Sequence, residues 1–284
     1  MTFFEAILLG LIQGLTEFLP ISSTAHLTLA GKLMGLINSH TPGAWTEFMA
    51  IVQMGTLAAV VVYFSRDLFN IMGGVVIDMR SRLGGTLPDT VSDDARTGYF
   101  VLIGTVPVAV TGLLFSKGIH GPFTKSTPVI IASLVVLAAL LWLAEKVARH
   151  VRTLSNLTTM DAIVVGVAQA LALIPGSSRS GTTITAGLFL NFTREAAARF
   201  SFLLSIPAIL ASGAYELLKL DGEVAQFGYG NLAIATLVAG VSGYMAITWL
   251  LKFLSRNSTM LFVWYRFALG LVLVLLLRFG MIQP

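Results

Sequence analysis

Long apolar runs alternate with short polar segments along this chain, and six of the runs are long enough to cross a membrane as helices. They lie at roughly 48–64, 97–115, 129–144, 200–217, 232–251 and 261–279. Crossing the hydrocarbon core of a bilayer takes about 20 mainly apolar residues, with some latitude. The pattern therefore predicts an all-α integral membrane protein with about six transmembrane helices.

Four other apolar stretches are too short or too interrupted to span. These are 3–19, which stops at Pro20, then 24–37, then 161–174, which stops at Pro175, and about 180–193. Each consecutive pair could form a re-entrant helical hairpin, which enters the bilayer and returns on the same side. Backbone left unpaired at a hairpin tip is tolerated only inside protein or beside water. We therefore expect a polar site at the two tips.

The two breaks have similar sequences. Residues 10–23 read GLIQGLTEFLPISS and residues 166–178 read GVAQALALIPGSS, so that in each a Gly is followed three residues later by Gln and then by Pro-x-Ser-Ser. The first copy has one residue more between Gln and Pro than the second. If six spans alternate, the two hairpins enter from opposite sides. We expect an inverted-topology repeat, with halves at about 1–115 and 129–279 of a single membrane domain (1–284), and a shared site near the midplane.

Composition supports the membrane assignment. The chain is 56% hydrophobic and 11% charged, with a mean hydropathy of +0.85, which excludes a soluble protein with a charged, patch-free surface. It has no cysteine, so disulfides and thiolate metal sites are excluded. Membrane lipids are the expected surroundings, no nucleic-acid partner is expected, and a homodimer is left open.

Basic residues orient the chain, because cytoplasmic loops of membrane proteins are enriched in Lys and Arg. One side of the predicted topology collects Arg66, Arg80, Arg82, Arg96, Lys146, Arg149, Arg152, Arg194, Arg199, Lys252 and Arg256. The other side collects Lys32, Lys117, Lys125, Lys219 and Arg278. We place the first side in the cytoplasm, which puts both termini outside. The polar stretch at 81–96 is then a predicted cytoplasmic loop.

The residues after each break favour anion binding. Candidate helix N-caps follow both prolines, namely Ser22, Ser23, Thr24, Ser177 and Ser178. A helix N-terminus offers free N–H groups and a partial positive charge to a phosphate. Arg179 adds a planar fork of donors that can grip phosphate oxygens with two hydrogen bonds. These features predict a site for phosphate or pyrophosphate.

An acidic group near the first break adds a second kind of chemistry. Gln13 and Glu17 are four residues apart, hence on one face of a helix. A carboxylate in an anion site must either move protons or hold a divalent cation, and Mg²⁺ or Ca²⁺ could bridge it to phosphate oxygens. His26 follows Ser23 by three residues, close enough to act as its base or as an acid toward a leaving group.

Simpler roles compete with these. The sole role of Arg179 could be an ion pair with Glu17, and His26 could cap a backbone carbonyl. Gln169 could be structural, because no acid lies near it. Arg266 could either extend to the cytoplasmic interface or form a structural ion pair.

At QGLTEFLPISSTAH and PGSSRSGTT the sequence resembles the undecaprenyl pyrophosphate phosphatase family linked to bacitracin resistance, and the resemblance extends over EFMAIVQMG, RFSFLLSIPA and WYRFALG. It implies a bacterial inner-membrane enzyme that removes the terminal phosphate of a C55 isoprenyl pyrophosphate. The product is the monophosphate carrier used again for peptidoglycan. The resemblance also implies a site open to the periplasm and dependence on a divalent cation.

The family's functional residues carry over to matching positions of this sequence. The acidic, serine and histidine positions of the catalytic set fall on Glu17, Ser23 and His26. The phosphate-binding arginine falls on Arg179, beside Ser178 and Thr183. We add Thr24 from the first break as a further phosphate-binding residue, and Gln13 and Ser22 as supporting residues of the site. This chain departs from some members in having Gln13 in place of Glu, and a mechanism that needs two carboxylates there would fail.

Two mechanisms and a second class of function stay open. Either Ser23 attacks the terminal phosphorus and water then releases phosphate, or water attacks directly and Ser23 only binds phosphate. A lipid transporter or flippase is the alternative function, because inverted repeats with broken helices are typical of transporters.

Overall fold

The computed structural model describes residues 1–37, 42–84, 91–115, 126–218 and 222–282 of the chain. Apart from an isolated bridge between Arg152 and Phe192, regular structure in these ranges is helical, which confirms the predicted all-α class. The α-helices are α1 (Phe3–Phe18), α2 (Ser23–Leu33), α3 (Pro42–Tyr63), α4 (Ser65–Leu83), α5 (Asp93–Leu114), α7 (Thr127–Val147), α8 (Thr159–Ala170), α9 (Arg179–Phe189), α10 (Arg194–Leu218), α11 (Tyr229–Leu254) and α12 (Met260–Arg278). Short 3₁₀ helices are η2 (Leu154–Asn156), η3 (Leu171–Leu173) and η4 (Glu223–Phe227).

Six of these helices are long and apolar enough to cross a membrane. They are α3, α5, α7, α10, α11 and α12, and each coincides with one of the six apolar runs in the sequence. The prediction of six spans is therefore confirmed within the described residues. We conclude that the chain is a multi-pass membrane protein.

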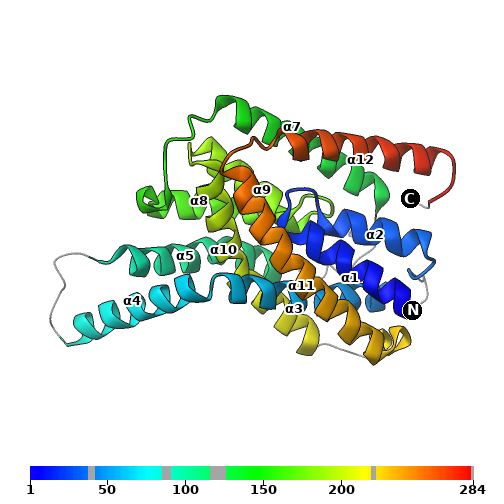
Figure 1. Ribbon diagram of the computed structural model, residues 1–284, viewed down its shortest axis with the longest axis horizontal. Coiled ribbons are helices and arrows are strands. Elements are labelled where there is room, and N and C mark those ends of the chain that lie inside the picture. Colours follow the sequence, from blue (N-terminus) through cyan, green and yellow to red (C-terminus); the bar gives the residue numbers. More distant parts are fainter. Residues whose placement is uncertain (38–41, 85–90, 116–125, 219–221, 283–284) are drawn as a thin grey trace.

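Helix α4 is absent from the sequence prediction. It packs beside α5, and the two extend together away from the rest of the molecule in Figure 1. The Tyr99 hydroxyl of α5 donates to Asp78 Oδ2 of α4 over 2.7 Å. The charged residues of α4 lie near its two ends, so the uncharged stretch between them, 68–77, is too short to indicate a membrane span. The loop predicted at 81–96 is shorter than expected, because α4 ends at Leu83 and α5 begins at Asp93; residues 85–90 lie outside the described part.

The four short apolar stretches form two pairs of helices joined by tight turns. In Figure 1, α1 runs from the end that carries the N-terminus to the middle of the molecule, and α2 returns. In the second pair, Arg152 Nη1 donates both to Asp161 Oδ1 at the start of α8 and to the Leu190 carbonyl at the end of α9, each over 3.0 Å. The open ends of α8 and α9 are therefore neighbours, as in a hairpin.

Helix α1 lies directly against α11, with no room for a side chain at Gly14. A Cβ on Gly14 would lie 2.0 Å from Ser242 Oγ and 2.5 Å from the Ala239 carbonyl. Small residues let membrane helices approach this closely and gain dispersion contacts that lipid does not offer. The close approach places the polar residues of α1 at the centre of the bundle.

Candidate active site

The two breaks predicted from the sequence meet in the structure. The Ser180 hydroxyl, in the first turn of α9, donates to the Leu19 carbonyl in the first break over 3.0 Å. Beside this contact lies a cavity of about 290 Å³. Its wall includes Gln13, Glu17, Ser23 and Thr24 from the first pair of helices and Gln169, Ser178 and Arg179 from the second. The contact therefore brings chemistry from both halves of the chain to one place.

Helices α2 and α9 begin at these breaks in matching ways. Ser22 caps α2 with φ of 75° and accepts from the Ala25 N–H over 3.3 Å. Ser178 caps α9 with φ of 69° and accepts from the Gly181 N–H over 3.1 Å. A positive φ is unusual for a residue other than glycine, so both turns hold their caps in an uncommon conformation. Capping by Ser22 and Ser178 is confirmed, whereas Ser177 lies one residue before the cap.

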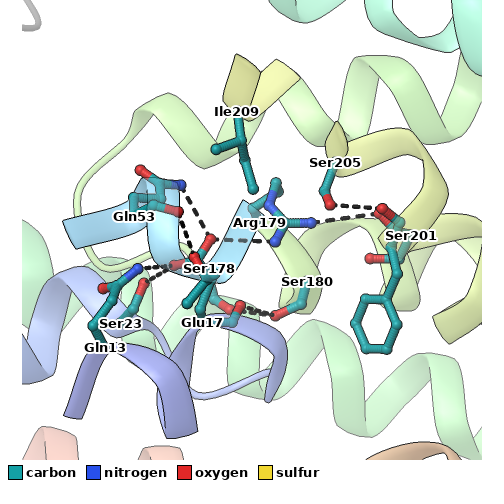
Figure 2. A network of polar contacts seen from close by, with 12 residues as sticks. Gln13, Glu17, Ser23, Gln53, Ser178, Arg179, Ser180, Ser201, Ser205 and Ile209 are labelled. Atoms are coloured by element: carbon teal, nitrogen blue, oxygen red, sulfur yellow. Dashed lines mark hydrogen bonds and ion pairs between the residues drawn. The ribbon is translucent and has the colours of Figure 1, made fainter. Parts of the chain in front are cut away.

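The carboxylate of Glu17 is the centre of the polar network (Figure 2). Its Oε2 accepts from the Ser23 hydroxyl over 2.7 Å and from Gln13 Nε2 over 3.0 Å. Its Oε1 accepts from Gln53 Nε2 and from Arg179 Nη2, each over 3.2 Å. Four donors thus surround a side chain that is only 5% exposed. A buried carboxylate needs such compensation, because desolvation penalises the charge.

Gln53, in α3, is the hydrogen-bond partner of Glu17 that sequence reasoning missed. It lies within an apolar run, where a polar side chain is expensive and marks a candidate functional position. The sequence therefore marked Gln53 as a candidate. It could not indicate the contact with Glu17, because the two residues are 36 apart in the chain.

Arg179 faces both the cavity and the protein interior. Besides its bond to Glu17, its Nη1 donates to the Ser201 carbonyl over 3.4 Å, and its Nε has no hydrogen-bond partner among the described residues. The ion pair weighed above as a simpler role is therefore present. The two bonds use two of the five N–H groups of the guanidinium, so a ligand role remains compatible with the geometry.

The ring of His26 forms its hydrogen bonds with groups other than Ser23. Its Nδ1 lies 2.7 Å from the Ser22 carbonyl, which can only accept, so Nδ1 carries a proton. Its Nε2 lies 2.7 Å from the hydroxyl of Tyr265, and the two rings stack. The carbonyl contact considered from the sequence is therefore present. A role of His26 as the base for Ser23 stays a prediction, which this arrangement does not support.

The remaining predicted residues divide by location. Thr24 lines the cavity. Thr183 is buried within α9, where its hydroxyl bonds with the Arg179 carbonyl over 2.8 Å and with Ser201 Oγ over 2.6 Å, and it is not part of the cavity wall. Phosphate binding by Thr183 stays a prediction, and its observed contacts stabilise the start of α9 behind Arg179.

Arg266 differs from both alternatives considered for it. The side chain is fully buried, so it does not extend to an interface, and no carboxylate partner is found for it within the described ranges. It donates instead to backbone carbonyls at both breaks and on α7, at distances of 3.1–3.4 Å: Pro20, Gly176, Ser177, Ser133 and Leu134. One side chain thereby ties the two breaks to α7.

Comparison with known proteins agrees with this arrangement. The family model described as bacitracin resistance protein BacA matches residues 6–272. The chain belongs to the BacA family. A protein of Syntrophobacter fumaroxidans named undecaprenyl-diphosphatase is 51% identical over 275 residues, covering 95% of each chain. Proteins of the same name from Renibacterium salmoninarum and Myxococcus xanthus are each 48% identical, covering 99% and 100% of this chain and 98% and 92% of their own. The resemblance noted in the sequence is confirmed.

The cavity of this BacA family member offers few ligands for a metal ion. Within the described residues, no group of three or more His, Asp or Glu side chains comes together. Glu17 is the carboxylate of the network, and the nitrogen ends of Gln13 and Gln53 face it, which leaves their amide oxygens available. Mg²⁺ is commonly held by one or two carboxylates together with substrate phosphates. The donor set therefore fits a cation that arrives with a diphosphate.

Proposed function

We infer that this chain is an undecaprenyl-diphosphatase, a hydrolase that converts C55 isoprenyl diphosphate to the monophosphate carrier and inorganic phosphate. The observation that carries the inference is the convergence of Ser23, Glu17 and Arg179 at one cavity. It occurs in a chain that matches proteins of that name over nearly its whole length. The hydrolysis would supply lipid carrier for cell-wall synthesis in a bacterial inner membrane.

We propose that the diphosphate binds between the N-termini of α2 and α9. Both helices begin at the cavity, where free N–H groups and the helix dipole favour an anion. Arg179 adds charge and directional donors. The bound phosphate would share the guanidinium with Glu17, so that Arg179 contacts both the carboxylate and the phosphate. Ser178 and Thr24 lie on the same wall.

The proposed chemistry begins at Ser23. Its hydroxyl donates to Glu17 over 2.7 Å, so Glu17 is already placed to take the proton as Ser23 Oγ attacks the terminal phosphorus. The bond from that phosphorus to the bridging oxygen breaks, and the lipid monophosphate leaves. Water then cleaves the phosphoserine and releases phosphate. This geometry favours Glu17 over His26 as base. Direct attack by water, with Ser23 only binding phosphate, remains the competing route.

We propose that a divalent cation, Mg²⁺ or Ca²⁺, accompanies the diphosphate, held by Glu17 with help from the amide oxygens of Gln13 and Gln53. Such an ion neutralises charge on the phosphates and supports the leaving group. Because position 13 holds Gln rather than Glu, the face of α1 that contains Glu17 has one negative charge fewer. The proposed proton transfer needs Glu17 as its only carboxylate and is compatible with this change.

We further propose that the two short helix pairs are re-entrant hairpins related as an inverted repeat, and that the cavity opens to the periplasm. Support comes from the matching caps of α2 and α9 and from the direct contact of the two turns. The same feature favours a second candidate, a polyprenyl-phosphate transporter or flippase, because broken helices that meet near the midplane are typical of transporters.

Phosphate release by the purified protein in detergent tests the main proposal, because transport needs two compartments and hydrolysis does not. We expect metal-dependent release from farnesyl diphosphate, a fall of about 10²–10⁴-fold for Glu17→Gln, and a comparable fall for Ser23→Ala. A smaller effect of His26→Ala would agree with its contacts. A phosphoserine trapped at position 23 would support covalent catalysis, and solvent oxygen in phosphate without such an intermediate would support attack by water. No release by the wild type would contradict the proposal.

A further inference from the structure

Gln169 in α8 corresponds to Gln13 in α1, because each follows a Gly by three residues, although Gln169 lies six residues before its Pro and Gln13 seven. Both side chains are buried, with 1% and 2% of their surface exposed. Gln13 has a partner, because Glu17 lies four residues later and accepts from its amide. Four residues after Gln169 the chain has Leu173 instead. The second break thus retains the amide but lacks the acid that would bind it.

The amide of Gln169 consequently stands unpaired. In the part of the chain that the structure describes, neither its Nε2 nor its Oε1 has a hydrogen-bond partner. A buried amide without partners lowers stability, and protein interiors rarely tolerate it without a functional reason. Replacement by leucine would remove this penalty at nearly the same volume. The side chain therefore has no structural bond that explains its presence.

Gln169 also forms part of the wall of the cavity that contains Glu17, Ser23 and Arg179. Among the described residues, Arg179 Nε is a second buried nitrogen without a hydrogen-bond partner, and its side chain also lines this cavity. Two N–H donors without partners, beside one cavity and both from the second half of the chain, match a ligand rich in acceptor oxygens. A diphosphate is such a ligand, and the first-half donors Gln13 and Gln53 are already engaged with Glu17.

We propose that Gln169 is a substrate-binding residue whose Nε2–H donates to a diphosphate oxygen of the lipid substrate. The inference rests on the proposed function for the identity of that ligand. The divergence of the two breaks then has a physical consequence. In the first half, the amide of Gln13 is bound to Glu17. In the second half no carboxylate takes that position, so the amide of Gln169 is left to bind the substrate.

The test uses two substitutions at position 169 and a matched control. Gln169→Leu removes the amide at similar volume, and Gln169→Glu keeps the shape but turns a donor into an anion. Gln226→Leu makes the same change on the exposed surface of η4. The full-length proteins in detergent would be titrated with the methylene-bridged, non-hydrolysable analogue of farnesyl diphosphate by calorimetry. Hydrolysis of farnesyl diphosphate and thermal unfolding without ligand would be measured in parallel.

We expect Gln169→Leu to weaken analogue binding about tenfold or more, since a hydrogen bond to a charged group is lost. Gln169→Glu should weaken it further by repulsion, and both should raise KM more than they lower kcat. Gln226→Leu should behave as the wild type. Without ligand, Gln169→Leu should unfold at the wild-type temperature or above, because it removes an unpaired amide.

Unchanged binding in both variants at position 169 would overturn the proposal. The proposal would also fail if Gln169→Leu lowered the unfolding temperature and its loss of analogue binding followed that loss of stability, because Gln169 would then have a structural role. If the wild type binds the analogue but releases no phosphate, the hydrolase proposal fails while the binding role of Gln169 stands. If the wild type does not bind the analogue, both fail.

Discussion

Glu17 and Arg179 lie 162 residues apart in the chain, yet they form one buried ion pair. Each charge would be costly alone in a membrane protein, and each compensates part of the desolvation of the other. Serine and glutamine donors complete the shell around the carboxylate. At this scale the site is a buried, compensated charge pair, which by our proposal rearranges when a phosphate binds.

Arg179→Lys tests whether the shape of the guanidinium matters beyond its charge. Lysine keeps the positive charge but cannot bind two oxygens in a plane. We expect kcat/KM for farnesyl diphosphate to fall about 10- to 100-fold. Arg149→Lys, on the exposed surface, serves as the control and should leave the rate unchanged. Near-normal turnover of Arg179→Lys would contradict the phosphate-binding role proposed for Arg179.

Arg266→Lys tests the link between the breaks and α7. An ammonium group has three donors and cannot reach the five carbonyls that the guanidinium contacts. We expect the free energy of unfolding to fall by about 2 kcal/mol or more, measured by thermal unfolding in detergent. Arg278→Lys, exposed at the end of α12, should have no such effect. Equal stability of the two variants would contradict the linking role.

At the scale of single elements, helix length and capping were readable in the sequence. Six apolar runs became six helices because an apolar segment of spanning length has few alternatives in lipid. Ser22 and Ser178 cap α2 and α9 as expected for serines before helices. Helix α4 was missed because its uncharged stretch, 68–77, is too short for a membrane span. Contacts with α5 stabilise it.

Gly14→Ala tests the contact between α1 and α11. The added methyl would lie 2.0 Å from Ser242 Oγ, whereas a methyl at Gly112 in α5 would meet nothing within 4 Å. We expect Gly14→Ala to lower the free energy of unfolding by about 1–3 kcal/mol through overpacking. Gly112→Ala should be neutral or slightly stabilising, because alanine favours a helix over glycine. Similar unfolding temperatures for both variants would show that α1 can move away without cost.

At the scale of the whole molecule, the two halves contribute unequally to one cavity. The first half supplies Ser23 and Glu17, and the second supplies Arg179 and, by our proposal, Gln169. The described contacts between the breaks require both halves to be folded together. The orientation predicted from basic residues is a separate matter, and Lys117, Lys125 and Lys219, which contribute to it, lie outside the described residues.

Single cysteines can test that orientation cleanly, because the chain has none of its own. Ser155 precedes α8 and Gln226 precedes α11, and both are exposed. We expect a membrane-impermeant thiol reagent added to intact spheroplasts to label Gln226→Cys and to spare Ser155→Cys until the membrane is opened. The opposite pattern would reverse the topology and place the proposed site on the cytoplasmic side.

The sequence by itself determined the helical class, the six spans, the positions of the two breaks and the family, because these depend on local composition and spacing. It also singled out Glu17, Ser23 and Arg179. Only the tertiary structure decided which polar groups meet: Gln53 joins Glu17, Arg266 binds both breaks, and His26 turns to Tyr265. Polar groups in an apolar bundle must find partners, but the partner depends on how distant helices pack, and no local pattern in the chain encodes that choice.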